Sequence, residues 1–210
     1  SLGANLVINY IGDKTQAEDT KAECEKLGAK VALSEGDVSK MADCEKLFQT
    51  AMDTFGRVDI LVNNAGIAKF SSLLMTRLEE VRKMFQVNYF ASLLVTQYIV
   101  KLMSRRKAGA IVNLASIAGI DSTVGNCGYG ASKAAMILST KVLARELSVY
   151  NIRVNAVAPG FIDTDIQSGI DRQLADNIIN NLSIRRLGTP EEVAKVILFL
   201  ASDQASYVNG

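Results

Sequence analysis

Short apolar runs alternate with longer amphipathic segments along this chain. Each run is rich in Val, Ile and Leu and gives way to small or polar residues, which is the pattern of a buried strand. The predicted strands span 5–10, 30–38, 58–66, 109–116 and 151–160. The intervening segments, such as 88–103 and 130–149, carry apolar residues at helical spacing. This alternation predicts an α/β fold with a mostly parallel sheet covered by helices.

Small and polar residues follow several of the predicted strands, as in "GDVS", "NNAG", "LASIAG" and "APG". Because the carboxyl ends of parallel strands meet at one edge of a sheet, these segments should lie close together. Ligands of open parallel sheets bind outside that edge. The sequence therefore predicts a binding site there.

Length and charge narrow the class of protein. At 210 residues the chain is long enough for one sizeable α/β domain, which we expect to span 1–210. The 23 basic and 22 acidic residues are interspersed, so we expect no nucleic acid and no anionic membrane as partner. No apolar run is long enough for a transmembrane helix, and no signal segment begins the chain. We expect a soluble, cytoplasmic protein.

Cysteine and histidine usage limits the chemistry. Cys24, Cys44 and Cys127 are widely spaced and the chain has no histidine, so we expect no metal site and no disulfide framework. The absence of histidine removes the usual general base. Acid and base chemistry must then use Tyr, Lys, Asp, Glu or Cys.

The segment "YGASK" places Tyr129 and Lys133 four residues apart, on one face of a predicted helix. A phenol and an ammonium so placed suit a proton-transfer site. Taken alone, such a pair is more often a half-buried aromatic residue beside a solvated lysine. The other strand-end motifs decide between the two.

Five motifs in order resemble the short-chain dehydrogenase/reductase family, and within it the 3-oxoacyl-acyl-carrier-protein reductases. They are "NNAG" (63–66), Asn88, Ser116, "YGASK" (129–133) and "NAVAPGFIDTD" (155–165). The resemblance covers essentially the whole chain. It implies a Rossmann-type, doubly wound parallel sheet in three α/β/α layers, forming a single NAD(P)-binding domain. It also implies an oxidoreductase of fatty acid biosynthesis that works as a homotetramer.

The resemblance assigns catalytic roles to four residues. It makes Tyr129 the proton donor, with its phenolate favoured by Lys133, which also binds the nicotinamide ribose. Ser116 would hydrogen-bond the substrate oxygen, although a turn serine is the alternative. Asn88 would distort its helix and hold a water that links Lys133 to solvent. The alternative for Asn88 is a satisfied buried amide.

The resemblance also implies a cofactor site. The residues expected at the adenine, the adenosine ribose and the nicotinamide are Asp37, Val38, Asn64, Ala65, Gly66, Pro159, Gly160, Ile162 and Thr164, together with Tyr129 and Lys133. Asp163 and Asp165 are expected to be loop and helix-cap residues rather than metal ligands. No acid stands at Asn9 or Tyr10, where NAD-preferring relatives bind the ribose hydroxyl, so NADP is favoured, with NAD as the alternative.

Two family features are absent from the sequence. Relatives begin with a strand and a T-G-x-x-x-G-x-G turn that holds the pyrophosphate, and they continue past "YVNG" into a last strand. We expect these 210 residues to be a fragment of a longer chain, incomplete at both ends and lacking the first strand. A polypeptide that began at Ser1 would bind cofactor weakly and fold poorly.

The predicted substrate is a 3-oxoacyl thioester on an acyl-carrier protein. Another secondary alcohol, such as a sugar, polyol or steroid, is the alternative, and a non-catalytic nucleotide-binding scaffold is a third. Segment 162–188 has the length of a substrate lid, or is plain amphipathic packing. The "SRRK" cluster (104–107) suits an acidic carrier protein, or is a solvated helix end. Helices 88–103 and 130–149 are expected to form the main dimer contact, and Cys127 is a packing residue near the site.

Overall fold

Five parallel strands form the centre of the fold. β1 (Leu6–Tyr10) pairs with β2 (Val31–Glu35), and β3 (Ile60–Asn63), β4 (Gly109–Leu114) and β5 (Ile152–Val157) pair in that order. The structure is a computed structural model that describes residues 3–121, 124–164, 179–180 and 182–210. The strands are shorter than the sequence predicted, because the small residues after each apolar run form loops.

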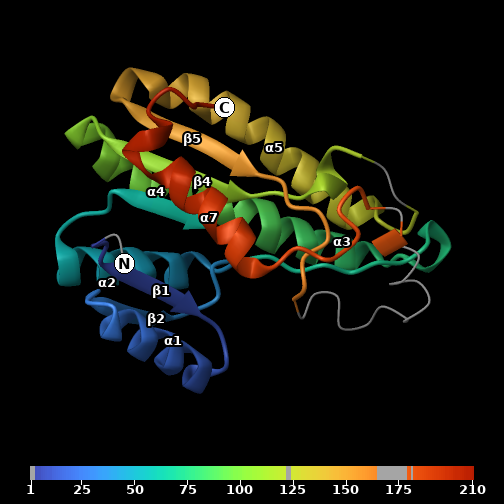
Figure 1. The fold of residues 1–210 in the computed structure, drawn as a ribbon, viewed down its shortest axis with the longest axis horizontal. Helices are drawn as coiled ribbons and strands as arrows, with labels where there is room; N and C mark the ends of the chain where they lie inside the picture. The colour runs from blue at the N-terminus through green and yellow to red at the C-terminus, as the bar shows by residue number, and fades with distance from the viewer. Residues whose placement is uncertain (1–2, 122–123, 165–178, 181) are drawn as a thin grey trace.

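Helices cover both faces of these strands. The helices are α1 (Lys14–Lys26), α2 (Met41–Phe55), α3 (Leu78–Phe85), α4 (Ala91–Arg106), α5 (Cys127–Leu147) and α7 (Pro190–Ala201), with a π-helical turn η2 (Gln86–Phe90) before α4. Single 3-10 turns are η1 (Leu73–Met75), η3 (Ile117–Gly119), η4 (Ser148–Tyr150) and η6 (Asp203–Ala205). Figure 1 shows α7 crossing one face of β4 and β5, with α4 and α5 behind.

Strand β4 is buried on both sides, as its continuous apolar sequence predicted. Ile111 packs in the cluster formed with α4 and α5, while the next residue, Val112, packs against Leu200 of α7. Successive side chains of a strand point to opposite faces, so β4 lies between two helical layers. The predicted three-layer, doubly wound α/β/α fold is confirmed.

The strands form two groups rather than one continuous sheet. Among the described residues, no strand pairs with β1 or β3 on the side where the two groups face each other (Figure 1). On β3, Ile60 and Val62 remain 43% and 40% exposed. The sequence analysis expected the first strand of the sheet to be absent from these 210 residues. The unpaired N–H and C=O groups at such a sheet edge can pair with a further strand.

A buried chain of polar side chains ties the second group of strands to its helices. The amide of Asn63 donates to Thr96 Oγ1 (3.1 Å) and to Asn113 Oδ1 (2.8 Å), and Asn113 donates to Thr140 Oγ1 (2.9 Å). These bonds join β3 and β4 to α4 and α5 just before the carboxyl ends of the strands. Buried polar groups satisfied in this way fix the relative position of the elements that carry them.

None of the described helices is long and apolar enough to cross a membrane.

Candidate active site

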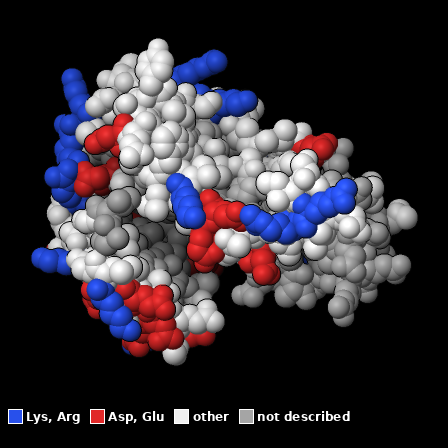
Figure 2. Space-filling view, viewed as in Figure 1, with Lys and Arg blue, Asp and Glu red and all other residues white. Residues whose placement is uncertain are grey.

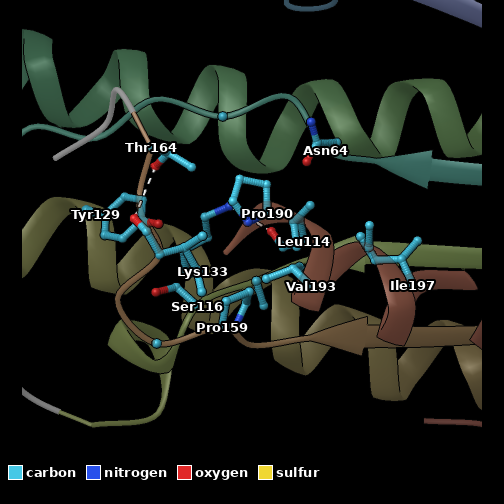
Figure 3. A pocket seen from close by; sticks show the side chains of 15 residues that line it. Asn64, Leu114, Ser116, Tyr129, Lys133, Pro159, Thr164, Pro190, Val193 and Ile197 are labelled. Carbon is cyan, nitrogen blue, oxygen red and sulfur yellow. Dashed lines mark hydrogen bonds between the residues drawn. The ribbon is translucent and has the colours of Figure 1, made fainter. Parts of the chain in front are cut away.

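A cavity of about 320 Å³ opens at the carboxyl ends of β3, β4 and β5, where the sequence predicted a binding site. Its lining is formed by Asn64, Gly66, Leu114, Ala115, Ser116, Tyr129, Lys133, Pro159, Gly160, Ile162, Thr164, Pro190, Val193, Ala194 and Ile197. Figure 3 shows Ser116, Tyr129 and Thr164 gathered at one end of the cavity. The hydroxyl groups make this the polar end, while the other end holds the apolar side chains of α7 and the amide of Asn64.

Two hydroxyl groups meet at the polar end of the cavity. Tyr129 lies in the first turn of α5, and Ser116 follows β4 directly. The Ser116 hydroxyl lies beside the phenol of Tyr129, close enough to influence its pKa, and it accepts a hydrogen bond from the Ala118 amide (3.2 Å). Burial raises the pKa of Tyr129, and the nearby Ser116 hydroxyl opposes that rise. Tyr129 is therefore protonated at neutral pH and able to donate.

Lys133 lies one helical turn after Tyr129 and is only 5% exposed. Its ammonium donates to the Leu114 carbonyl oxygen (2.7 Å) and lies 5.8 Å from the centre of the Tyr129 ring. Burial lowers the pKa of Lys133 to about 8. The sequence predicted that Lys133 would favour the phenolate, whereas burial is the main influence on the pKa of Tyr129 in this structure.

Asn88 lies beside the cavity rather than in its lining and is 1% exposed. Its Oδ1 accepts from the Ile67 amide (2.8 Å), and its Nδ2 donates to the Ile67 carbonyl (3.0 Å) and to Ser132 Oγ (2.9 Å). Ser132 in turn donates to the Tyr129 carbonyl (2.7 Å). Asn88 thus joins the loop after β3 to the first turn of α5, and its π-helical turn is the helix distortion that the resemblance implied.

Comparison with known proteins identifies the family. Residues 1–210 match the family model described as enoyl-(acyl carrier protein) reductase. A 3-oxoacyl-[acyl-carrier-protein] reductase of Synechocystis sp. is 38% identical over 99% of this chain and 83% of its own length. The corresponding reductase of Thermotoga maritima is 38% identical over 99% of this chain and 84% of its own. The chain belongs to the short-chain dehydrogenase/reductase family. It is an NAD(P)-dependent oxidoreductase.

Solved structures of short-chain dehydrogenase/reductases share the fold. A levodione reductase superimposes with a TM-score of 0.92 at 32% identity, covering 99% of this chain and 84% of its own. A gluconate 5-dehydrogenase from Burkholderia cenocepacia, solved with NADP and tartrate, gives a TM-score of 0.90 at 26% identity, covering 97% and 80%.

The structure brings most of the predicted site residues of this short-chain dehydrogenase/reductase together. Those in the cavity lining are Asn64, Gly66, Ser116, Tyr129, Lys133, Pro159, Gly160, Ile162 and Thr164. Ala65, Asp37 and Val38 lie outside the lining, and Asp165 lies outside the described residues. In the part of the chain that the structure describes, no cluster of Cys, Asp and Glu could hold a metal ion.

Asp37 follows β2 at its carboxyl end, away from the cavity. Its carboxylate accepts from the hydroxyl and the amide of Ser39 (2.6 and 2.9 Å), and these bonds hold its pKa below the ordinary value. The Asp37 amide donates to Asp43 (2.9 Å). The turn is therefore fixed in shape, with Val38 packed against the core next to it.

The basic cluster 104–107 lies at the far end of the sheet from the cavity. Arg106 donates to the Val58 carbonyl (3.2 Å) and forms an ion pair with Asp59, close to the start of β4. Ser116 follows the other end of that strand. Basic and acidic side chains are interspersed on the face shown in Figure 2. These positions favour the interpretation of the cluster as a solvated helix end. They disfavour the alternative that it docks an acyl-carrier protein beside the active site.

Two glycines position the site and were missed in the sequence analysis. A Cβ on Gly119 would lie 2.6 Å from the Ala134 nitrogen and 2.7 Å from the Lys133 carbonyl carbon. A Cβ on Gly130 would lie 2.7 Å from the Ala118 oxygen. The backbone after Ser116 therefore touches the backbone of α5. Their positions inside "LASIAG" and "YGASK" are the signal, since a glycine next to a site residue indicates a close approach of backbone.

We expect Gly119→Ala to lower the free energy of unfolding by about 2–3 kcal/mol, because the added methyl group meets backbone atoms that cannot move away. Urea unfolding followed by circular dichroism measures this. Gly160→Ala is the matched control, since a Cβ there meets no atom within 4 Å, and it should change stability by less than about 0.5 kcal/mol. Equal stability of the two variants would refute the packing argument.

Proposed function

We propose that this enzyme reduces the 3-oxo group of an acyl thioester, carried on acyl-carrier protein, to the 3-hydroxyl with NADPH. The observation that carries the proposal is the meeting of the Ser116 and Tyr129 hydroxyls beside the Lys133 ammonium at one end of the cavity. A single oxygen atom can accept from both hydroxyls. The substrate class is suggested by the similarity to the 3-oxoacyl-[acyl-carrier-protein] reductases of Synechocystis and Thermotoga maritima.

The residues at the polar end account for the proton and for the charge on the substrate oxygen. Ser116 donates a hydrogen bond to the carbonyl oxygen and stabilises the negative charge that develops there. Tyr129 donates its proton to the same oxygen as the carbon–oxygen double bond becomes a single bond. Lys133, as an ammonium, stabilises the phenolate that remains. A bound nicotinamide supplies the hydride that the carbonyl carbon accepts.

The cavity suits the nicotinamide and its ribose. Its volume lies at the small end of the range of about 300–1,000 Å³ for ligand pockets. At Gly66 a Cβ would lie 3.5 Å from Lys133 Nζ, so the glycine leaves the space in front of the ammonium clear. Lys133 would hold the nicotinamide ribose, Asn64 would line the adenosine-ribose side, and the 159–164 loop would border the nicotinamide. Asp37 and Val38 would bound the adenine.

We propose NADP rather than NAD as the cofactor. The Asn9 side chain at the end of β1 donates to the carbonyls of Ser34 and Gly36 (both 3.0 Å). The nearest carboxylate in sequence, Asp13, caps α1 by accepting from Thr15 and Gln16. The described residues at the end of β1 therefore include no acidic side chain placed to bind a ribose 2′-hydroxyl. A kcat/KM for NADPH above that for NADH supports the choice, and the reverse order contradicts it.

Assembly and compartment follow from the same proposal. Leu138 and Val142 on α5 remain 65% and 45% exposed, which suits a helix that packs against a second subunit. We propose the homotetramer implied by the family resemblance. We propose the cytoplasm as its compartment, which suits the free thiols of Cys24, Cys44 and Cys127.

The test of function is a substrate panel with the natural full-length protein and NADPH. It compares acetoacetyl-acyl-carrier protein with its 2-enoyl counterpart, with a keto acid of a sugar, and with a cyclic diketone. We expect kcat/KM for acetoacetyl-acyl-carrier protein to exceed the others by about a hundredfold or more. A preference for the sugar acid would favour the second candidate, an alcohol dehydrogenase like the gluconate 5-dehydrogenase that shares the fold.

A further inference from the structure

An aromatic side chain packs against the catalytic tyrosine from outside the cavity. The rings of Phe70 and Tyr129 meet edge to face, with their centres 5.7 Å apart and their planes at 71°. Phe70 is not part of the cavity lining, so it lies on another side of the Tyr129 ring. Its side chain is nevertheless 48% exposed. Phe70 therefore extends an apolar surface outward from the point where the substrate oxygen binds.

The loop that carries Phe70 is anchored on both sides of it. Three residues earlier, Ile67 is held through both backbone groups by Asn88. On the other side, the Ser71 amide donates to the Gly125 carbonyl (2.9 Å), and the Ser71 hydroxyl bonds that of Thr76 (2.9 Å). Phe70 is thus fixed in place before any substrate arrives. A rigid aromatic wall selects between substrates better than a mobile one.

Uncharged and exposed apolar residues lie close to Phe70 in the chain and across the Ser71–Gly125 contact. Segment 70–75, "FSSLLM", carries no charge, and the ammonium of the preceding Lys69 is paired with Glu80 (4.0 Å). Across the Ser71–Gly125 contact, Val124 is 96% exposed, and Ile120 in the same loop is 70% exposed. A hydroxylated substrate chain would lose its bonds to water here without replacement. An aliphatic chain would bury apolar surface at no such cost.

We propose that Phe70 is a specificity-determining residue that packs against the aliphatic tail of the substrate, beyond its 3-oxo carbon. This inference rests on the proposed function and deepens it. The substrate class becomes 3-oxoacyl thioesters with an unbranched hydrocarbon tail of several carbons. The contact between the Phe70 and Tyr129 rings supports this proposal. When the substrate carbonyl bonds the Tyr129 hydroxyl, one of the two substituents on the carbonyl carbon must lie along the Tyr129 ring, toward Phe70.

The test compares the kcat/KM for 3-oxooctanoyl and acetoacetyl thioesters in wild type, Phe70→Ala and Phe70→Leu, in the natural full-length protein. The longer tail reaches the wall, and the single methyl group of the acetoacetyl thioester does not. In Phe70→Ala we expect kcat/KM for the longer substrate to fall about tenfold, with a change below about threefold for the shorter. Phe70→Leu should restore most of the preference. Tyr150→Ala is the matched control, since Tyr150 is an aromatic residue that is 41% exposed, lies before the start of β5 and is outside the cavity lining.

The outcomes separate this inference from the function on which it rests. If wild type reduces both thioesters and Phe70→Ala lowers both equally, Phe70 merely supports Tyr129 and the inference is overturned. If Tyr150→Ala changes the ratio of the two kcat/KM values as much as Phe70→Ala does, the inference is also overturned. If wild type reduces neither thioester but reduces another ketone, the proposed function fails and takes this inference with it.

Discussion

Replacing Tyr129 by phenylalanine is expected to lower kcat by about a thousandfold or more, while the affinity for NADPH stays within a few fold. The change removes the hydroxyl that shares the substrate oxygen with Ser116, and positioned proton donors contribute about 10²–10⁴ to the rate. The ring itself, with its contact to Phe70, remains. Initial rates with acetoacetyl-acyl-carrier protein measure kcat, and fluorescence titration measures cofactor binding.

Tyr98→Phe is the matched control for this experiment. It removes the same oxygen from Tyr98 of α4, whose hydroxyl donates to Glu45 of α2 and which lies outside the cavity lining. We expect wild-type kcat from it. A Tyr129→Phe enzyme that kept more than about a tenth of the wild-type rate would show that the proton comes from another group.

Lys133→Met is expected to lose about a hundredfold or more in kcat and yet to fold more stably than wild type. The loss follows because the ammonium beside Tyr129 disappears. The gain follows because Lys133 is 5% exposed and its pKa is lowered to about 8, which means that burying the charge is unfavourable. Allowing for the lost bond to the Leu114 carbonyl, we expect a gain of about 1–2 kcal/mol.

The stability gain should depend on pH in a defined direction. Between pH 8 and the ordinary lysine pKa of 10.5, the unfolded chain binds the proton more tightly than the folded one, so wild-type stability rises with pH. The cost of the buried ammonium is complete below about pH 8 and is lost above 10.5. The advantage of Lys133→Met should therefore be largest at pH 7 and shrink as the pH rises through 8.

Urea unfolding without nucleotide, at pH 7 and at pH 9.5, measures this difference. Lys141→Met, on the exposed side of the same helix, is the control and should alter stability little at either pH. A Lys133→Met protein less stable than wild type at pH 7 would mean that the ammonium stabilises the fold, contrary to this account.

The parts of the fold that the sequence predicted depend on local patterns. The apolar run through Ile111 and Val112 marks a strand buried on both faces, and the spacing of Tyr129 and Lys133 places both on one side of α5. Parallel strands then bring Ser116 to the same edge without further information. Periodicity and strand direction therefore place Ser116, Tyr129 and Lys133 at one edge of the sheet. The other predicted lining residues came from the family resemblance, and the lining residues of α7 were not predicted.

The parts that could not be predicted depend on contacts between distant residues. Asn88 bonds a backbone 21 residues away, and no local pattern specifies that partner. The close approach at Gly119 depends on how the turn η3 meets α5, and the packing of Phe70 depends on an anchor formed by Gly125.

The measurement that tests the central claim most directly follows a label through a single turnover. NADPH carrying two deuterium atoms at the reactive ring carbon is incubated with acetoacetyl-acyl-carrier protein and the natural full-length protein, and the acyl product is analysed by mass spectrometry. The account predicts 3-hydroxybutyryl product with one deuterium at carbon 3. A product without deuterium, or with deuterium at any other carbon, would contradict it.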